Sequence, residues 1–140
     1  KKDTTMCVEI FKRRMSVDTQ FWQTDAITAS LAKYIENSFF AAKVTFCNEW
    51  YDIAKSYGVD WNELRELWLL DPRINRNHTL VFERDRGYGG RCFPKDVKAI
   101  INDVKKMGYS AELMRAVDEV NERIRYEQGT AQSSDRKVHK

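Results

Sequence analysis

The sequence has little glycine or proline, with 6 Gly and 2 Pro in 140 residues. None of them precedes Gly58, and five of the eight fall between Pro72 and Pro94. Because these residues punctuate regular structure, the pattern predicts long helical segments first and an irregular loop later. The composition, 42% hydrophobic and 32% charged, is that of a globular chain. It excludes a wholly disordered or collagen-like protein.

Cysteine and histidine are also scarce. The three cysteines, Cys7, Cys47 and Cys92, are odd in number and have unrelated spacings, which excludes a disulfide framework and indicates a reducing cytoplasm. The two histidines, His78 and His139, lie far from the cysteines in the sequence, and there is no C-x-x-C pair. We therefore predict no metal site.

Long apolar runs and one-sided charge are missing as well. No run approaches the roughly 20 residues that span a bilayer, and the first residues lack the layout of a signal peptide. The 24 Lys and Arg against 21 Asp and Glu leave a net charge of +3, with acids and bases alternating along the chain. A nucleic-acid binder usually gathers its positive charge into a stripe. We expect a cytoplasmic protein with neither a membrane nor a nucleic-acid partner.

Hydrophobic spacing and capping residues predict an all-α fold. A short segment, Val17–Trp22, alternates weakly and could be a strand, but a single strand needs a partner outside this chain. The expected helices are Thr4–Met15, a very long one from a cap at Thr24 or Asp25 to Tyr57, Asp60–Leu70, Pro94–Met107 stopped by Gly108, and Ala111–Tyr126 capped by Ser110.

The long helix would measure roughly 50 Å at 1.5 Å per residue, whereas a compact domain of this size is about 30 Å across. Its middle, Phe39–Cys47, is apolar on nearly every face. A helix that is apolar all round must be buried all round, and the remaining helices are too few to cover it. We therefore predict a homodimer in which a second copy of the chain covers this helix.

Cys92 lies in the glycine-rich segment Arg86–Asp96. If Pro94 is the first helical residue, Cys92 lies just ahead of a helix N-terminus, with Arg91 and Lys95 as neighbouring positive charges. These conditions lower the pKa of a thiol and favour a reactive thiolate. The alternative is a buried structural cysteine beside a glycine turn.

Lys33 and Asn37 lie four residues apart and so share a helix face among apolar neighbours. A desolvated lysine beside an amide could donate protons and stabilise an oxyanion. The alternative is a lysine that extends to solvent beside a polar neighbour. Arg73, after Asp71-Pro72, could bind phosphate or carboxylate, or could be an ordinary surface arginine.

Three segments, Lys33–Glu49, Leu70–Ile74 and Gly87–Asp96, occur in the order and spacing of the nucleotide-sugar 6-dehydrogenases. They resemble that family's long central helix, an intervening Asp-Pro-Arg-Ile segment and its catalytic-cysteine motif. The similarity extends from about Val17 to about Arg125. Within the family the chain looks most like the UDP-glucose 6-dehydrogenases, and less like the GDP-mannose or UDP-N-acetylmannosamine enzymes.

The resemblance implies a protein with an NAD-binding Rossmann domain, a central helical dimerisation domain and a nucleotide-sugar domain, of which this chain resembles the central one. Residues 1–23 would be a terminal helix and strand of the Rossmann domain, residues 24–127 the central domain, and residues 128–140 a flexible tail. No G-x-G-x-x-G pattern is present. We therefore expect a fragment that oxidises nothing by itself, because NAD would be bound mainly by a domain absent from this chain.

The resemblance also implies a four-electron oxidation of a UDP-sugar with two NAD. Cys92 would attack the C6 aldehyde to give a thiohemiacetal, and a thioester would follow. Lys33 would handle protons and Asn37 would donate a hydrogen bond, while Asp96 would orient or activate water and Lys95 would approach the cofactor. The residues implied to contact the sugar nucleotide are Lys33, Asn37, Arg73 (in the partner subunit's site), Val81, Phe82, Glu83, Arg84, Asp85, Tyr88 and Gly89.

Two departures from the family pattern affect these expectations. Asn75 stands where the family often has glycine, and the segment from Arg73 to Cys92 is of the longer variety. A second hypothesis stays open, that the chain is a non-enzymatic helical dimerisation module in which the apolar helix is the whole function.

Overall fold

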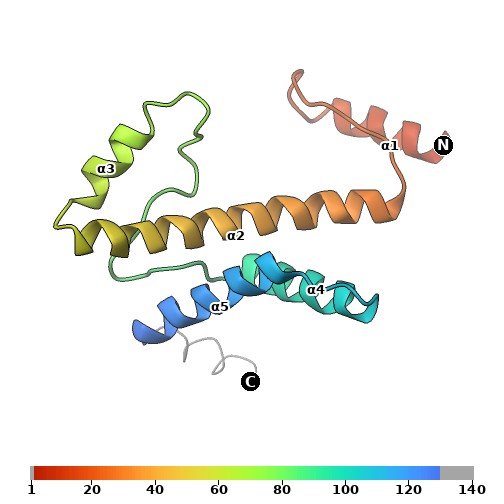
Figure 1. Cartoon of the computed structure of the whole chain (residues 1–140). Coiled ribbons are helices and arrows are strands. Elements are labelled where there is room, and N and C mark those ends of the chain that lie inside the picture. The colour runs from red at the N-terminus through yellow and green to blue at the C-terminus, as the bar shows by residue number, and fades with distance from the viewer. Residues whose placement is uncertain (1, 130–140) are drawn as a thin grey trace. The chain divides into compact units, whose positions relative to one another are not determined.

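The computed structural model describes residues 2–129 (Figure 1). It contains five helices and, within the described residues, no strand. The predicted all-α class is therefore confirmed. The chain forms two units, residues 1–32 and 33–140, each described by itself below.

The first unit contains helix α1, Lys2–Lys12, close to the predicted Thr4–Met15. Val17–Trp22, a possible strand only with a partner outside this chain, forms a turn followed by irregular backbone in the single chain. Val17 is 99% exposed and Trp22 is 91% exposed. A strand requires a hydrogen-bonded neighbour, and this unit supplies none among its described residues.

Helix α2, Ala26–Ser56, begins at the capping residue Asp25. Its Oδ1 accepts hydrogen bonds from the backbone amides of Ile27 and Thr28, both at 2.9 Å. The side-chain bond from Thr28 lowers the pKa of Asp25, which keeps the cap ionised. Of the two predicted caps, Asp25 is thus the one used. The helix has 31 residues and measures about 46 Å, which confirms the predicted long helix.

Helix α3, Trp61–Trp68, also begins at an aspartate, since Asp60 accepts a hydrogen bond from the Glu63 amide at 2.9 Å. The chain then continues without helix or strand to Cys92, as the clustered glycines and prolines predict. Arg65 and Thr79 join α3 to this loop through a buried hydrogen bond of 2.8 Å.

Helices α4, Phe93–Lys106, and α5, Glu112–Glu127, follow within one residue of the predicted ranges. Gly108, with φ +82°, ends α4 as expected. The predicted cap at Ser110 is wrong. The residue before α5 is Ala111, which has no side-chain cap, and the Ser110 hydroxyl instead accepts a hydrogen bond from Arg115 at 3.5 Å.

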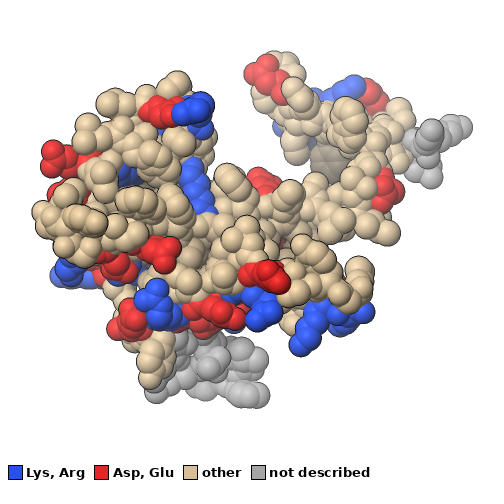
Figure 2. Space-filling model, in the orientation of Figure 1, with Lys and Arg blue, Asp and Glu red and all other residues tan. Residues whose placement is uncertain are grey.

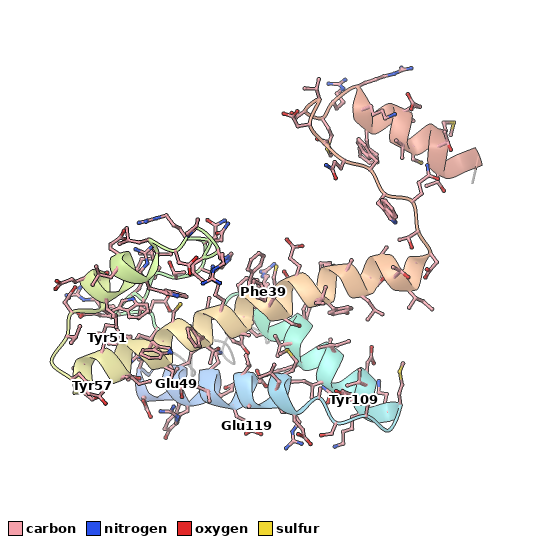
Figure 3. The ribbon with its side chains drawn as sticks, turned by 45° about the horizontal axis from the view of Figure 1, so that its top comes forward. Phe39, Glu49, Tyr51, Tyr57, Tyr109 and Glu119 are labelled. Carbon is pink, nitrogen blue, oxygen red and sulfur yellow. The ribbon has the colours of Figure 1, made fainter. Side chains whose placement is uncertain are left out.

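The core of the second unit forms where α2, α4 and α5 meet, and both ribbon views show α4 and α5 along the same side of α2 (Figures 1 and 3). Ala41, Tyr88, Val97 and Val117 make up this buried cluster. Phe93, the first residue of α4, packs against it. The core therefore fixes the start of α4, next to Cys92, against the middle of α2.

No helix in the described part of the chain is long and apolar enough to cross a membrane. Residues 130–140, most of the predicted tail, lie outside the described range. Gln128, the first residue of that tail, accepts a hydrogen bond from the Arg86 amide at 3.1 Å and donates one to the Glu83 carbonyl at 2.9 Å. On the face shown in Figure 2, basic side chains lie beside acidic ones.

The cap of α3 provides a direct test of local stability. We expect Asp60→Ala to lower the free energy of unfolding by about 1 kcal/mol, because the Glu63 amide loses its acceptor. Urea denaturation would measure the change. Asn62→Ala, an exposed substitution in the same helix, is the control. Equal stability of the two variants would show that the cap contributes nothing.

Candidate active site

Asp96 lies at the centre of a cluster of polar side chains from α2 and α4. Its side chain is fully buried. Oδ2 accepts hydrogen bonds from Lys33 Nζ at 3.0 Å and from Asn37 Nδ2 at 2.5 Å, and Oδ1 accepts one from Lys95. Lys33 and Asn37 therefore share a helix face, as their spacing predicts, and that face meets the first turn of α4.

This arrangement determines the charge of the cluster. The hydrogen bonds from Lys95 and Lys33 hold the pKa of Asp96 well below its usual 3.8, against the opposing effect of desolvation. The bond to Asp96 in turn raises the pKa of Lys95. Asp96 is thus an ionised carboxylate with both oxygens engaged, which makes it a weak base and a good orienting group.

Cys92 immediately precedes α4 and is exposed, so it is not the buried structural cysteine of the alternative reading. Its carbonyl accepts a hydrogen bond from the Asp96 amide at 2.9 Å, so Cys92 and Asp96 lie one helical turn apart. Lys95 is close enough to interact electrostatically with Cys92 and Tyr34. Cys47, in contrast, is buried, and burial raises the pKa of its thiol to about 11. Cys92 is the better placed of these two thiols for chemistry.

The structure thus brings Lys33, Asn37 and Lys95 to Asp96, which lies one helical turn from Cys92. The loop Val81–Asp85, which was predicted to contact the sugar nucleotide, makes its contacts with other parts of the chain. In that loop Glu83 accepts a hydrogen bond from the Tyr51 hydroxyl at 2.9 Å, and Asp85 pairs with Arg125 at 3.3 Å. Val81 is half-buried, whereas Phe82 and Arg84 are exposed. The described contacts of this loop are with the ends of α2 and α5, and none is with the Asp96 cluster.

Tyr88 and Gly89 connect that loop to Cys92. The Tyr88 ring is buried edge-on against Phe93, with a centroid distance of 6.3 Å, and its hydroxyl donates to Asp118 at 3.2 Å. Burial is the main reason that the pKa of Tyr88 lies far above its usual value. Tyr88 is therefore a neutral packing residue in this conformation. Gly89 is half-buried beside Arg125.

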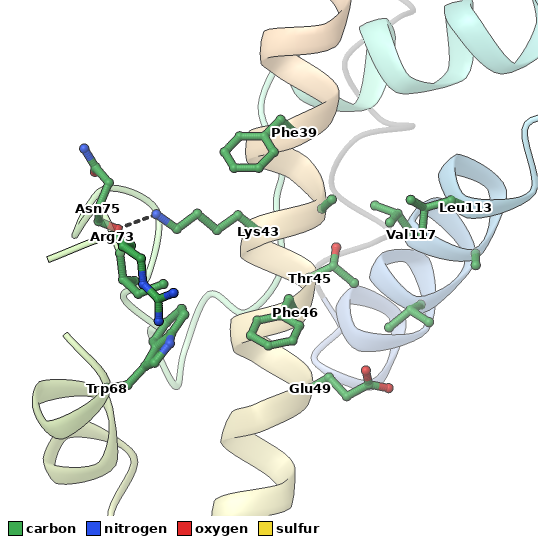
Figure 4. A pocket seen from close by; sticks show the side chains of 14 residues that line it. Phe39, Lys43, Thr45, Phe46, Glu49, Trp68, Arg73, Asn75, Leu113 and Val117 are labelled. Atoms are coloured by element: carbon green, nitrogen blue, oxygen red, sulfur yellow. Dashed lines mark hydrogen bonds between the residues drawn. The ribbon is translucent and has the colours of Figure 1, made fainter. Parts of the chain in front are cut away.

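Arg73 lies apart from the Asp96 cluster. Its guanidinium pairs with Asp71, with Nη2 at 2.6 Å from Oδ2, and the side chain is 85% exposed. It lines a groove of about 490 Å³ along α2, together with Phe39, Phe46 and Trp68, while Leu113 and Val117 of α5 line the other side (Figure 4). Lys43 extends from α2 to the carbonyl of Asn75 at the edge of this groove.

Sequence reasoning did not identify Asn48, Arg86 and Asn121 as site residues. Asn48 and Asn121 are each 2% exposed. Both form hydrogen bonds with the backbone of Arg86–Gly90, which is called the glycine segment below. The available signal was an amide residue among the apolar positions of each helix, since a buried amide requires partners. Within the described residues no group of three or more His, Cys, Asp or Glu could hold a metal ion.

The charge state of Asp96 gives a pH-dependent stability. Because folding lowers the pKa of Asp96, the ionised carboxylate stabilises the fold above its unfolded value of 3.8, and this contribution is lost as the pH falls through the lower folded value. We expect wild type to lose more stability than Asp96→Asn between about pH 7 and about pH 3, measured by urea denaturation. Asp103→Asn, at an exposed position of α4, should behave like wild type. Equal acid sensitivity of wild type and Asp96→Asn would contradict the expectation.

Comparison with known proteins identifies relatives of this chain. UDP-glucose 6-dehydrogenase of Rickettsia prowazekii is 31% identical over 121 residues, which are 86% of this chain and 27% of the relative. UDP-glucose 6-dehydrogenase of Pseudomonas aeruginosa is 39% identical over 95 residues, 68% of this chain and 20% of the relative. UDP-glucose 6-dehydrogenase AglM of Haloferax volcanii is 37% identical over 100 residues, 71% of this chain and 23% of the relative.

The aligned part of the chain thus spans about a quarter of the length of these curated relatives. The family model for the central domain of the UDP-glucose/GDP-mannose dehydrogenase family matches residues 27–123. That range contains α3, α4, the glycine segment, the Asp96 cluster and nearly all of α2. The chain belongs to the UDP-glucose/GDP-mannose dehydrogenase family, as its central domain.

Proposed function

We propose that this chain supplies the catalytic cysteine and its proton-handling groups to a cytoplasmic enzyme that oxidises UDP-glucose to UDP-glucuronate. The observation that supports this most directly is the Asp96 cluster, which ties Lys33 and Asn37 of α2 to the helical turn that begins at Cys92. The names of these relatives favour UDP-glucose over GDP-mannose or UDP-N-acetylmannosamine as the substrate.

The chain's own residues account for the steps at C6 of the sugar. After the alcohol has lost a hydride and a proton, the Cys92 thiolate forms a C–S bond to the aldehyde carbon, and the carbonyl oxygen takes a proton from Lys33. The thiohemiacetal then loses that proton and a second hydride and becomes a thioester. Water adds to the thioester, the C–S bond breaks, and the products are the carboxylate, the Cys92 thiolate and two protons.

The other cluster residues position these groups. Asn37 donates a hydrogen bond toward the developing oxyanion, and Asp96 orients Lys33 and the attacking water. Since both oxygens of Asp96 already accept hydrogen bonds, we assign it orientation rather than proton abstraction. Gly89 and the loop Val81–Asp85 remain candidates for contact with the sugar nucleotide, whereas Tyr88 is buried in the core in this conformation and would have to move to reach it.

NAD accepts the two hydrides when it is bound. The described residues contain no strand, so they offer no sheet edge for a dinucleotide, and Lys95 is the single residue that we expect to approach the cofactor. Residues 2–129 therefore do not fit NAD by themselves. We propose that the isolated chain does not oxidise UDP-glucose and that another domain holds the cofactor.

The groove along α2 supports a second part of the proposal, a homodimer through this helix. Apolar side chains of α2 are open to solvent in the single chain, with Ile35 71%, Phe39 61% and Phe46 48% exposed. Monomeric proteins rarely expose such a continuous apolar surface. The exposed row follows a helix of about 46 Å, which suits the same helix of a second copy. Arg73, at the rim of the groove, would then reach the partner subunit's site.

The covalent step can be tested without the cofactor. The 6-aldehyde of UDP-glucose, labelled with ¹³C at C6, should add reversibly to the chain and shift its C6 resonance to that of a thiohemiacetal. Cys92→Ser should abolish the new resonance, and Lys33→Met should weaken the addition about tenfold or more, since one charge-assisted hydrogen bond is lost. Cys47→Ser, which alters a buried thiol, is the control. A resonance that persists in Cys92→Ser would contradict the assignment.

The dimer can be tested by sedimentation of the chain. We expect wild type to sediment as a dimer and Phe39→Glu as a monomer, because a carboxylate in the apolar groove would lose its hydration without gaining a partner. Tyr109→Glu introduces the same charge at the exposed turn between α4 and α5 (labelled in Figure 3) and should remain dimeric. A monomeric wild type at high concentration would overturn the dimer. It would leave the cysteine chemistry to be judged by the aldehyde experiment.

A further inference from the structure

We propose that Asn48 and Asn121 are positioning residues that hold the glycine segment Arg86–Gly90 and thereby set the position of Cys92. This inference rests on the proposed function in one respect, since it assumes that the position of Cys92 matters for its chemistry. The hold itself follows from contacts that involve neither substrate nor cofactor.

Asn48 of α2 binds the start of the segment. Its Oδ1 accepts hydrogen bonds from the Gly87 amide at 3.0 Å and from Arg86 Nε at 3.2 Å. Its Nδ2 donates to the Val44 carbonyl, one turn earlier in α2, at 2.9 Å. The bond to Val44 fixes the direction of the amide, so that the oxygen faces the segment.

Arg86 strengthens this attachment. Its guanidinium makes a two-bond contact with Asp52, at 2.6 and 2.8 Å, and also donates to the Asn48 carbonyl at 2.7 Å. The same group lies 4.7 Å above the ring of Tyr51. Three residues within about one turn of α2, Asn48, Tyr51 and Asp52, thus contribute to one binding place for Arg86. A planar two-bond contact restricts orientation as well as distance.

Asn121 of α5 binds Tyr88 through both the backbone amide and the backbone carbonyl of that residue. Oδ1 accepts the Tyr88 amide at 2.7 Å, and Nδ2 donates to the Tyr88 carbonyl at 3.1 Å. Both Asn121 and Tyr88 are buried. The Asn121 side chain thus satisfies both backbone groups of a buried residue that has no helix or strand partner for them.

The glycines allow this close approach. A Cβ at Gly87, where φ is +75°, would lie 2.6 Å from Asn121 Oδ1. A Cβ at Gly89 would lie 2.9 Å from the guanidinium of Arg125. Glycine is therefore required at Gly87, by its positive φ and by its contact with Asn121, whereas a side chain at Gly89 would have to displace the guanidinium of Arg125.

Together these contacts attach the chain to α2 at two points, one before Cys92 and one after it. Gly87, five residues before Cys92, is attached to Asn48, and Asp96, four residues after it, is attached to Lys33 and Asn37. Asn37 and Asn48 are about 16 Å apart along one helix. Because a helix is stiff over that distance, the two attachments limit how far Cys92 can move relative to Lys33 and Asn37.

Two measurements on the full chain test the hold directly. Hydrogen exchange of the Tyr88 amide should be at least about tenfold faster in Asn121→Ala than in wild type, with the amide of Ala54 unchanged. A nitroxide attached to Cys92, in a Cys7→Ser background that leaves no other exposed cysteine, should show a more mobile spectrum in Asn48→Ala and Asn121→Ala. Asn102→Ala, which removes an exposed amide from α4, should match wild type in both.

Conservative variants separate positioning from general stability. Asn48→Asp keeps both acceptor bonds to the segment and loses only the donor to Val44 within α2, so its label should stay less mobile than in Asn48→Ala. Asn121→Asp loses the donor to the Tyr88 carbonyl and should show a more mobile label than wild type. Thr79→Val, which removes the buried bond to Arg65, lowers stability away from the segment and should leave the label immobile. If the alanine variants fail to fold, the two aspartate variants carry the test.

The outcomes are decisive in both directions. The proposal would be overturned if the Asn121 variants showed the same Tyr88 amide exchange and the same label mobility as wild type. It would also be overturned if Thr79→Val made the Cys92 label as mobile as the asparagine-to-alanine variants do. The label and exchange experiments need no sugar nucleotide, so they can fail while Cys92 still adds to the aldehyde. They can equally succeed while it does not, and a failure of this inference is therefore distinguishable from a failure of the proposed function.

Discussion

A buried carboxylate requires compensation, and the way Asp96 obtains it organises the second unit of this protein. The charge lies in the first turn of α4, where helix polarity favours an anion, and α2 supplies two of its three hydrogen-bond donors. Removing an ion from water without such partners would cost several kcal/mol. The start of α4 is therefore held against one particular face of α2, and Cys92 is held with it.

The two sides of α2 have different contacts. One side meets α4, α5 and the glycine segment, through the Asp96 cluster, the core around Ala41 and the bonds of Asn48. The other apolar row, which includes Phe39 and Phe46, stays open in the single chain and lines the groove that we assign to a second copy. One rigid helix thus links the proposed chemistry to the proposed dimer, and Arg73 stands at the rim of the groove as the residue that would connect two sites.

Much of the fold could be predicted from sequence because the signals were local. Asp25, Asp60 and Gly108 mark helix ends by bonds or backbone angles within a few residues, and all three act where expected. Pro94 was expected to be the first residue of its helix and is the second, because α4 begins at Phe93. The possible strand at Val17–Trp22 stays a prediction, because a strand depends on a neighbour that alternation cannot reveal. Ser110 failed as a cap because its hydroxyl had another partner, Arg115.

The candidate site divides in the same way. The pairing of Lys33 with Asn37 followed from helical periodicity, and the place of Cys92 followed from Pro94. Their meeting at Asp96 joins residues 59 and 63 positions apart, which no local pattern determines. Asn48 and Asn121 were missed for the same reason, since their partners are backbone groups 33 to 39 positions away.

The most direct test of this account is the titration of the Asp96 carboxyl carbon by NMR in the intact chain. We predict a midpoint below 3.8, with the carboxyl still ionised when ordinary aspartates have taken up a proton, and an upward shift of that midpoint in Lys33→Met. A midpoint at or above 3.8 in wild type, or one that Lys33→Met leaves unchanged, would mean that α2 does not hold this charge. The link between Cys92 and the long helix would then be lost.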